Sequence, residues 1–227
     1  MKALEKFDFK FFIFYENKMF TSLKDEKFKQ HGLYYDSIYD GMENIILDIF
    51  NGNPDKYENS DDCPKIYSVL AEYHFKINGD IEKAKYYYEK GIALRDWECA
   101  AGMSNLTNDI DLIISYLERS ILYGNPRAVA MTLLGTHLMT RSYLKSDEND
   151  SKRAYNLMIK GMEKLDPLAA IQLVIYNLSK RDFKTAEYLL EVANFLSKIS
   201  VEYDLESFNL VYKNLYELIY KQERGLI

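Results

Sequence analysis

The chain has 227 residues, a hydrophobic content of 48% and a formal net charge of −6 at pH 7. It is long enough to bury a sizeable core, and we expect residues 1–227 to form a single domain. The acidic balance argues against nucleic acid as a partner, because phosphate binding rests on clustered Lys and Arg, whereas a basic protein fits. Cys63 and Cys99 are too few for a disulfide framework, so we expect a cytoplasmic protein.

Residues 1–30 are expected to form an N-terminal cap or arm. The apolar stretch 7–15, FDFKFFIFY, is interrupted by Asp8 and Lys10, and no small-residue cleavage site follows it. We therefore predict neither a secretion signal nor a membrane span. Alternating phenylalanines would suit a strand, and the spacing of Phe7 and Phe11 suits a helix, which we favour. Such a segment would cover the first repeat or contact a partner.

Residues 65–94, KIYSVLAEYHFKINGDIEKAKYYYEKGIAL, predict two short helices folded back on each other. Their turn combines Gly79, which can take the left-handed conformation that ends a helix, with Asp80, a good N-cap. Each helix carries one apolar stripe at helical spacing, and neither could bury it without neighbours. The expected inward residues are Ile66, Leu70, Tyr73 and Ile77, then Ile81, Ala84, Tyr88, Gly91 and Ile92.

The second helix of this pair recurs down the chain with a small residue at one place. Gly91 matches Ser120, Gly161 and Ala193, which follow at intervals of 29, 41 and 32 residues. These intervals bracket the period of a two-helix repeat, and a small residue there lets a neighbouring helix approach closely. The longest interval contains the polar stretch 146–151, SDENDS, which we interpret as an inserted, solvated loop.

Similar connections recur between the predicted helices. Gly52, Asn53 and Pro54 return as Gly124, Asn125 and Pro126, and Asp166 with Pro167 is a looser third case. Glycine ends one helix at such a place and proline starts the next. The recurrence supports a regular array in which each helix pair is followed by another.

The domain is expected to contain helical repeats over residues 31–199 and a C-terminal capping helix within residues 200–227. That last helix is amphipathic. Its exposed side is expected to be polar, with Lys213, Glu217 and Lys221 on it, because terminal repeats need a polar outer face for solubility.

Two stretches carry a family resemblance. Residues 78–92, NGDIEKAKYYYEKGI, and 149–162, NDSKRAYNLMIKGM, resemble the Sel-like repeats, a variant of the tetratricopeptide repeats, and the likeness extends over residues 64–196. This resemblance implies an all-α fold, a right-handed superhelical array of antiparallel helix pairs. It also implies a solenoid that binds other proteins or peptides and has no catalytic residues of its own.

The sequence shows no motif for catalysis, cofactor binding or metal binding. It has no phosphate-cradling glycine loop, no paired histidines on one helical turn and no nucleophile elbow. His31, His74 and His137 lie far apart and are expected to pack or to face solvent. Trp97 is interpreted as a core wedge between units. We therefore expect no enzyme activity, no cofactor and no metal.

Tyrosine is the compositional excess that bears on function, at 20 of 227 residues. Tyr86, Tyr87 and Tyr88 are consecutive, so on a helix they cannot all face the core. Tyrosine is enriched at interfaces, which makes Tyr86 or Tyr87 a candidate contact; alternatively, tyrosines simply plate a thin solenoid. The predicted partner-binding residues are Tyr86, Tyr87, Glu89, Lys90, Tyr116 and Arg119.

Two functions fit these observations. The first is a non-catalytic interaction module that binds a protein or peptide through its repeat surface. The alternative is a cytoplasmic immunity protein that neutralises a cationic toxin, since charge complementarity would speed and direct such binding. Neither function involves nucleic acid or a membrane, and the oligomeric state is left open.

Overall fold

The computed structural model describes residues 42–58, 64–199 and 205–225. In these ranges the regular secondary structure is helical, and there is no strand. The stretch 7–15 and the N-terminal cap or arm lie outside the described residues. Within them the elements are α3 (Glu43–Phe50), η2 (Pro54–Tyr57), α4 (Pro64–Lys76), α5 (Ile81–Ala93), α6 (Trp97–Ser104), α7 (Ile110–Leu122), α8 (Ala128–Lys145), α9 (Glu148–Glu163), α10 (Pro167–Ser179), α11 (Phe183–Ile199) and α12 (Leu205–Glu223).

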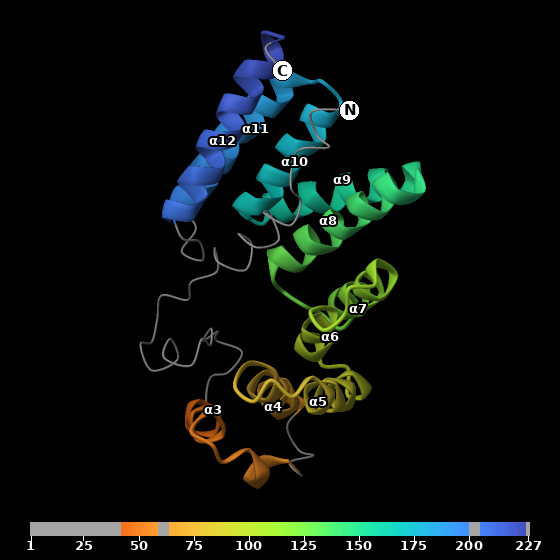
Figure 1. Ribbon diagram of the computed structural model, residues 1–227, viewed down its shortest axis with the longest axis vertical. Helices are drawn as coiled ribbons and strands as arrows, with labels where there is room; N and C mark the ends of the chain where they lie inside the picture. The colour runs from red at the N-terminus through yellow and green to blue at the C-terminus, as the bar shows by residue number, and fades with distance from the viewer. Residues whose placement is uncertain (1–41, 59–63, 200–204, 226–227) are drawn as a thin grey trace.

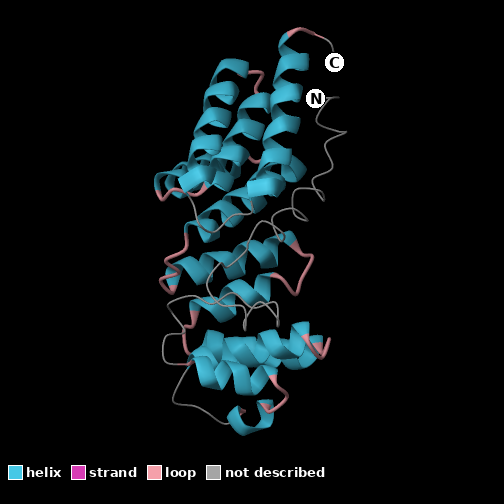
Figure 2. Cartoon of the chain, turned by 90° about the vertical axis from the view of Figure 1, so that its left-hand side faces the viewer, coloured by secondary structure: helices cyan, strands magenta, loops and turns pink. Residues whose placement is uncertain are grey.

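The helices pack in adjacent pairs that follow one another along the molecule (Figure 1): α4 with α5, α6 with α7, α8 with α9, and α10 with α11. The second helix of each pair also packs on the first helix of the next, and α11 packs on α12 in the same way. Figure 2 shows α4 to α7 lying across the long axis, whereas α10 to α12 run along it. The all-α expectation is confirmed, and the right-handed superhelical path stays a prediction.

Six junctions in the described part of the chain share one backbone arrangement. A residue with positive φ is followed at once by Asn or Asp, whose backbone N–H donates to the carbonyl five residues earlier at 2.9–3.2 Å. This is the hydrogen bond of a Schellman helix end. The positive-φ residues are Gly52, Arg95, Gly124, Ser146, Leu165 and Arg181, and the residues that follow them are Asn53, Asp96, Asn125, Asp147, Asp166 and Asp182.

At Asp96, Asp147, Asp166 and Asp182 the junction residue also starts the next helix, whereas Asn125 lies two residues before Arg127, the N-cap of α8. In five of the six junctions the side chain of the Asn or Asp accepts a hydrogen bond from a backbone N–H two or three residues later. Asp96 thus caps α6 through the Cys99 N–H, and Asp166 caps α10 through the Leu168 N–H. One residue therefore closes one helix and opens the next, which fixes the direction in which the chain turns back.

Replacing Leu165 by glycine tests the cost of this backbone geometry. Leu165 has φ +67° and a side chain that is 55% exposed, so glycine removes a left-handed strain and little packing. We expect the free energy of unfolding to rise by about 0.5–1 kcal/mol in chemical denaturation. Leu165→Ala is the matched control, because it trims the side chain but keeps the Cβ; an equal gain from both variants would contradict the explanation.

The recurring small residues lie where neighbouring helices touch, as predicted. A Cβ on Gly91 would lie 2.1 Å from Cys99 Sγ of α6, and a Cβ on Gly161 would lie 3.1 Å from the Ala169 Cβ of α10. Ala193 is completely buried. At the weakest predicted repeat, Ser120 is also buried, and its hydroxyl donates to the Trp97 carbonyl at 2.8 Å.

Adding one methyl group to Gly91 is therefore expected to be costly. Its nearest neighbours are both atoms of the buried Cys99, whereas at Gly135 a Cβ would meet Met158 Cγ at 3.1 Å and the Ala154 carbonyl oxygen at 3.2 Å, so a shift of a few tenths of an ångström relieves both contacts. Gly91→Ala should destabilise the protein by about 2 kcal/mol more than Gly135→Ala, because overpacking a rigid contact forces the backbone to shift. Equal unfolding midpoints for the two variants would contradict this explanation, because the α5–α6 contact would then accommodate a methyl group without a larger loss of stability.

Two expectations about local structure are wrong. Ile77 and Ile81 flank the turn between α4 and α5 and are 49% and 47% exposed, so they do not belong to the inward stripes. The stretch 146–151 is not an inserted loop: Asp147 caps α9, and Asp150 is buried in its first turn. The 41-residue interval is filled instead by long helices, with 18 residues in α8 and 16 in α9.

Candidate interaction surface

The three consecutive tyrosines of α5 have different surroundings. Tyr88 is buried, and its hydroxyl donates to Glu72 Oε1 at 2.7 Å. Tyr87 is only 1% exposed and stacks on the ring of His74, with centroids 5.4 Å apart. Tyr86 is 51% exposed. At least one tyrosine therefore meets solvent, as helical geometry required, but the prediction of Tyr87 as a surface contact is corrected: Tyr87 belongs to the core.

His74, beside Tyr87, is a buried titratable group. Its Nδ1 lies 3.2 Å from the Asn78 amide nitrogen, and its Nε2 has no hydrogen-bond partner among the described residues. Burial, assisted by the Lys83 charge, lowers the pKa of His74 below its usual value. Burial also lowers the pKa of His137 on α8. Both imidazoles are therefore held in the neutral form, as expected for His74 and His137 if they pack, and His31 lies outside the described residues.

These lowered pKa values predict a loss of stability in mild acid. The ordinary pKa of 6.5 is higher than the folded one, so below about pH 6.5 the unfolded chain binds more protons than the folded chain. The contribution of these histidines to the free energy of unfolding should be fully present above about pH 6.5 and should fall as the pH decreases below it, toward the lowered folded pKa values. Denaturation of His74→Gln across this range should show that the free energy of unfolding depends less on pH than in the wild type. An unchanged pH dependence would contradict the lowered pKa of His74 as its cause.

The remaining predicted site residues lie on two helices that both pack on α6. Lys90 of α5 places its ammonium 4.8 Å from the centre of the exposed Tyr86 ring. Arg119 of α7 places its guanidinium 5.8 Å from the half-buried Tyr116 ring. Glu89 is exposed. Among the described residues, no ring contact or ion pair joins the Tyr86 and Lys90 pair to the Tyr116 and Arg119 pair. We name Tyr86, Glu89, Lys90, Tyr116 and Arg119 the α5–α7 surface.

Trp97 is a wedge between helix pairs, as interpreted from the sequence. It is 9% exposed, and cations from two other helices lie at its ring: Lys65 Nζ of α4 at 4.4 Å and the guanidinium carbon of Arg127, which begins α8, at 5.0 Å. Lys65 also pairs with Asp96 at 2.8 Å, and Arg127 pairs with Glu98 at 3.4 Å. These charges hold neighbouring units together and are neutralised there.

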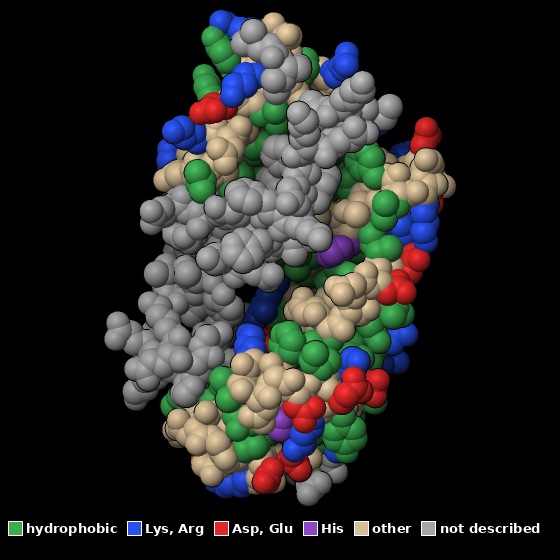
Figure 3. All heavy atoms as spheres, viewed as in Figure 1, with side chains coloured by type: hydrophobic (Ala, Val, Ile, Leu, Met, Phe, Trp, Pro, Cys, Tyr) green, Lys and Arg blue, Asp and Glu red, His purple; other side chains and the backbone are tan. Residues whose placement is uncertain are grey.

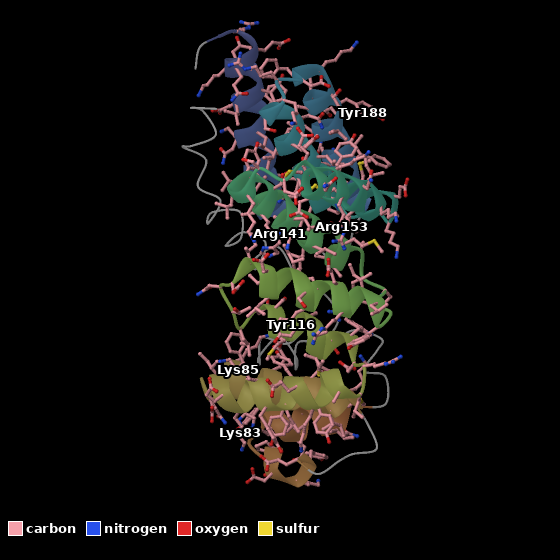
Figure 4. The ribbon with its side chains drawn as sticks, turned by 90° about the vertical axis from the view of Figure 1, so that its right-hand side faces the viewer. Lys83, Lys85, Tyr116, Arg141, Arg153 and Tyr188 are labelled. Atoms are coloured by element: carbon pink, nitrogen blue, oxygen red, sulfur yellow. The ribbon has the colours of Figure 1, made fainter. Side chains whose placement is uncertain are left out.

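A second set of ion pairs joins α7, α8 and α9. Arg141 contacts Asp150 at 2.6 Å and Asp111 at 2.9 Å, and Arg153 contacts Glu118 at 2.7 Å. Hydrogen bonds from Arg141 lower the pKa of Asp150. Arg141 and Arg153 are labelled in Figure 4, and Figure 3 shows basic and acidic side chains interspersed on the face in view. These cations already have carboxylate partners.

Sequence reasoning missed an aromatic surface on α11 and α12. Its exposed rings include Tyr188, labelled in Figure 4, and Phe195, which are 69% and 62% exposed. The Tyr212 hydroxyl of α12 donates to Glu191 Oε1 of α11 at 2.7 Å, and this hydrogen bond connects the two helices. The spacing of four residues between Tyr212, Tyr216 and Tyr220 was the available signal. The outer side of α12 is thus less polar than expected, since Tyr216 and Tyr220 are also exposed.

Other classes of site were sought in the part of the chain that the structure describes. No group of three His, Cys, Asp or Glu side chains there is arranged to hold a metal ion. None of the described helices has both the length and the apolarity needed to cross a membrane. No model of a known protein family matches the sequence, and no curated protein matches it. The likeness to Sel-like repeats therefore rests on the residues quoted for it.

Proposed function

We propose that this chain is a non-catalytic interaction module that binds a protein or peptide partner through the α5–α7 surface. The observation that carries the proposal is the environment of Tyr86. Its ring is 51% exposed, Lys90 lies over it at 4.8 Å, and the carboxylate of Glu89 is exposed beside it. Tyr and Arg are the residues that most often dominate binding energy at protein interfaces.

The architecture supports the same function. Stacked helix pairs present side chains from successive helices on one continuous surface, which is how repeat proteins bind extended partners. The packing of adjacent pairs fits Sel-like repeats on a right-handed superhelix, which we infer from the quoted motifs. The net charge of −6 favours a basic partner, whose Lys or Arg would approach Glu89 and stack on Tyr86, and we place the encounter in the cytoplasm.

Partner capture by surface variants tests this proposal. Tyr86→Ala combined with Lys90→Glu removes the exposed ring and reverses the charge over it, while both positions are at the surface of α5. We expect the main partner captured by the wild-type chain from its native host to bind at least about tenfold more weakly, a change of about 1.4 kcal/mol.

Tyr143→Ala is the matched control, because Tyr143 on α8 is also exposed, at 55%, and lies outside the α5–α7 surface. The control should bind like the wild type, and far-ultraviolet circular dichroism should show the same helix content for all variants. Equal capture by the wild type and the Tyr86 and Lys90 variant would remove the α5–α7 surface from the proposal.

A further inference from the structure

The outer face of α12 carries a line of residues with the spacing of a coiled-coil contact. The inner face is a buried stripe against α11, made by Phe208, Val211, Leu215 and Ile219. On the opposite side, residues follow at intervals of three and four, which keeps them on one face of a helix. We call this line the α12 seam, and its residues are Leu210, Lys213, Glu217, Tyr220 and Arg224.

The α12 seam is open to solvent, with Arg224 lying over the Tyr220 ring at 4.1 Å from the ring centroid. Leu210 and Tyr220 are each 44% exposed, and Lys213 makes no ion pair with any described residue. Glu217 is 54% exposed at its side chain and, among the described residues, pairs only with Lys221, at 3.7 Å. An exposed Leu and Tyr in one line with two unburied charges of opposite sign form a surface that another helix can cover.

The α12 seam is complementary to itself in one orientation. When two copies of α12 lie antiparallel with the two-fold axis midway between Lys213 and Glu217, Lys213 faces Glu217 of the second copy. By symmetry Glu217 faces Lys213 of the second copy, and Leu210 faces Tyr220 of the second copy. Two ion pairs are thus flanked by two apolar contacts, and every contact occurs twice, as a two-fold interface requires.

Other arrangements of the same two helices place like charges together. A parallel pair in register would set Lys213 against Lys213 and Glu217 against Glu217. An antiparallel pair shifted by one heptad would set Lys213 against Arg224. Like charges in contact are unfavourable, so these two arrangements are disfavoured relative to the antiparallel pair in which Lys213 faces Glu217.

Long-range electrostatics also favour α12 as the site of contact between two copies of the chain. Two chains that each carry a net charge of −6 repel each other in general. Helix α12 through Arg224 is neutral, because Lys213, Lys221 and Arg224 balance the three acidic residues Glu206, Glu217 and Glu223. The α12 seam therefore offers apolar burial without adding to that repulsion.

We propose that α12 is an interface between two copies of this chain, which pack antiparallel through the α12 seam. This interface is separate from the α5–α7 surface, so it stands or falls independently of the proposed binding function. A dimer of this kind would present two α5–α7 surfaces, and a partner with two binding sites would be held more tightly through avidity.

Charge exchange across the α12 seam tests the proposal by sedimentation equilibrium of the full chain. The wild type should show a concentration-dependent dimer. Lys213→Glu and Glu217→Lys should each weaken the dimer by about tenfold or more, because each turns two attractive pairs into two repulsive ones. The double variant Lys213→Glu with Glu217→Lys should restore the dimer, since it exchanges the two charges within the same register.

Mixing supplies a second measurement. An equimolar mixture of Lys213→Glu and Glu217→Lys should form a mixed dimer although neither variant dimerises well alone. Lys152→Glu, an equal charge change at an exposed position of α9, is the control and should dimerise like the wild type. A monomeric wild type, single variants that dimerise as the wild type does, or a double variant that stays monomeric would each overturn the proposal.

Discussion

The structure depends on how one helix pair is joined to the next. At Asp166 a single residue donates its backbone N–H to Gly161 at the end of α9 and caps α10 through Leu168, while its carboxylate also accepts a hydrogen bond from Thr132 of α8. Residues of three helices thus form hydrogen bonds with one buried residue. Similar junctions with Asn or Asp recur along the chain, so the arrangement of neighbouring helices is set locally, as in other repeat proteins.

This local control explains where binding surfaces can arise. The small residues at the helix contacts are fixed by packing, because Gly91 and Gly161 have no room for a Cβ. The outward positions between them are free to carry aromatic and charged side chains. Tyr86 with Lys90 on α5, and Tyr216 with Tyr220 on α12, occupy such positions. Interaction surfaces on the two helices can therefore differ while the scaffold stays the same.

The sequence was informative where a structural feature requires a particular type of residue, as a close contact between helices requires a small one. The small residues at Gly91, Ser120 and Gly161 predicted the close helix contacts, and the apolar stripes at helical spacing predicted the pairs of helices. The left-handed conformations of Arg95 and Leu165 could not be predicted from the sequence, because the junction imposes them on residue types that disfavour them. Burial of Tyr87 rather than Tyr86 depends on the rotation of α5 against α4, which helical spacing alone did not determine.

Hydrogen exchange of an Asp166→Ala variant tests most directly whether the junctions couple neighbouring helix pairs. We predict that amide protection falls together in α8, α9 and α10, because Asp166 contacts all three, and that α4 and α5 stay protected. Asp182→Ala, which removes an exposed cap at the start of α11, is the comparison and should affect α11 mainly. Loss of protection confined to the first turn of α10 in Asp166→Ala would contradict the account.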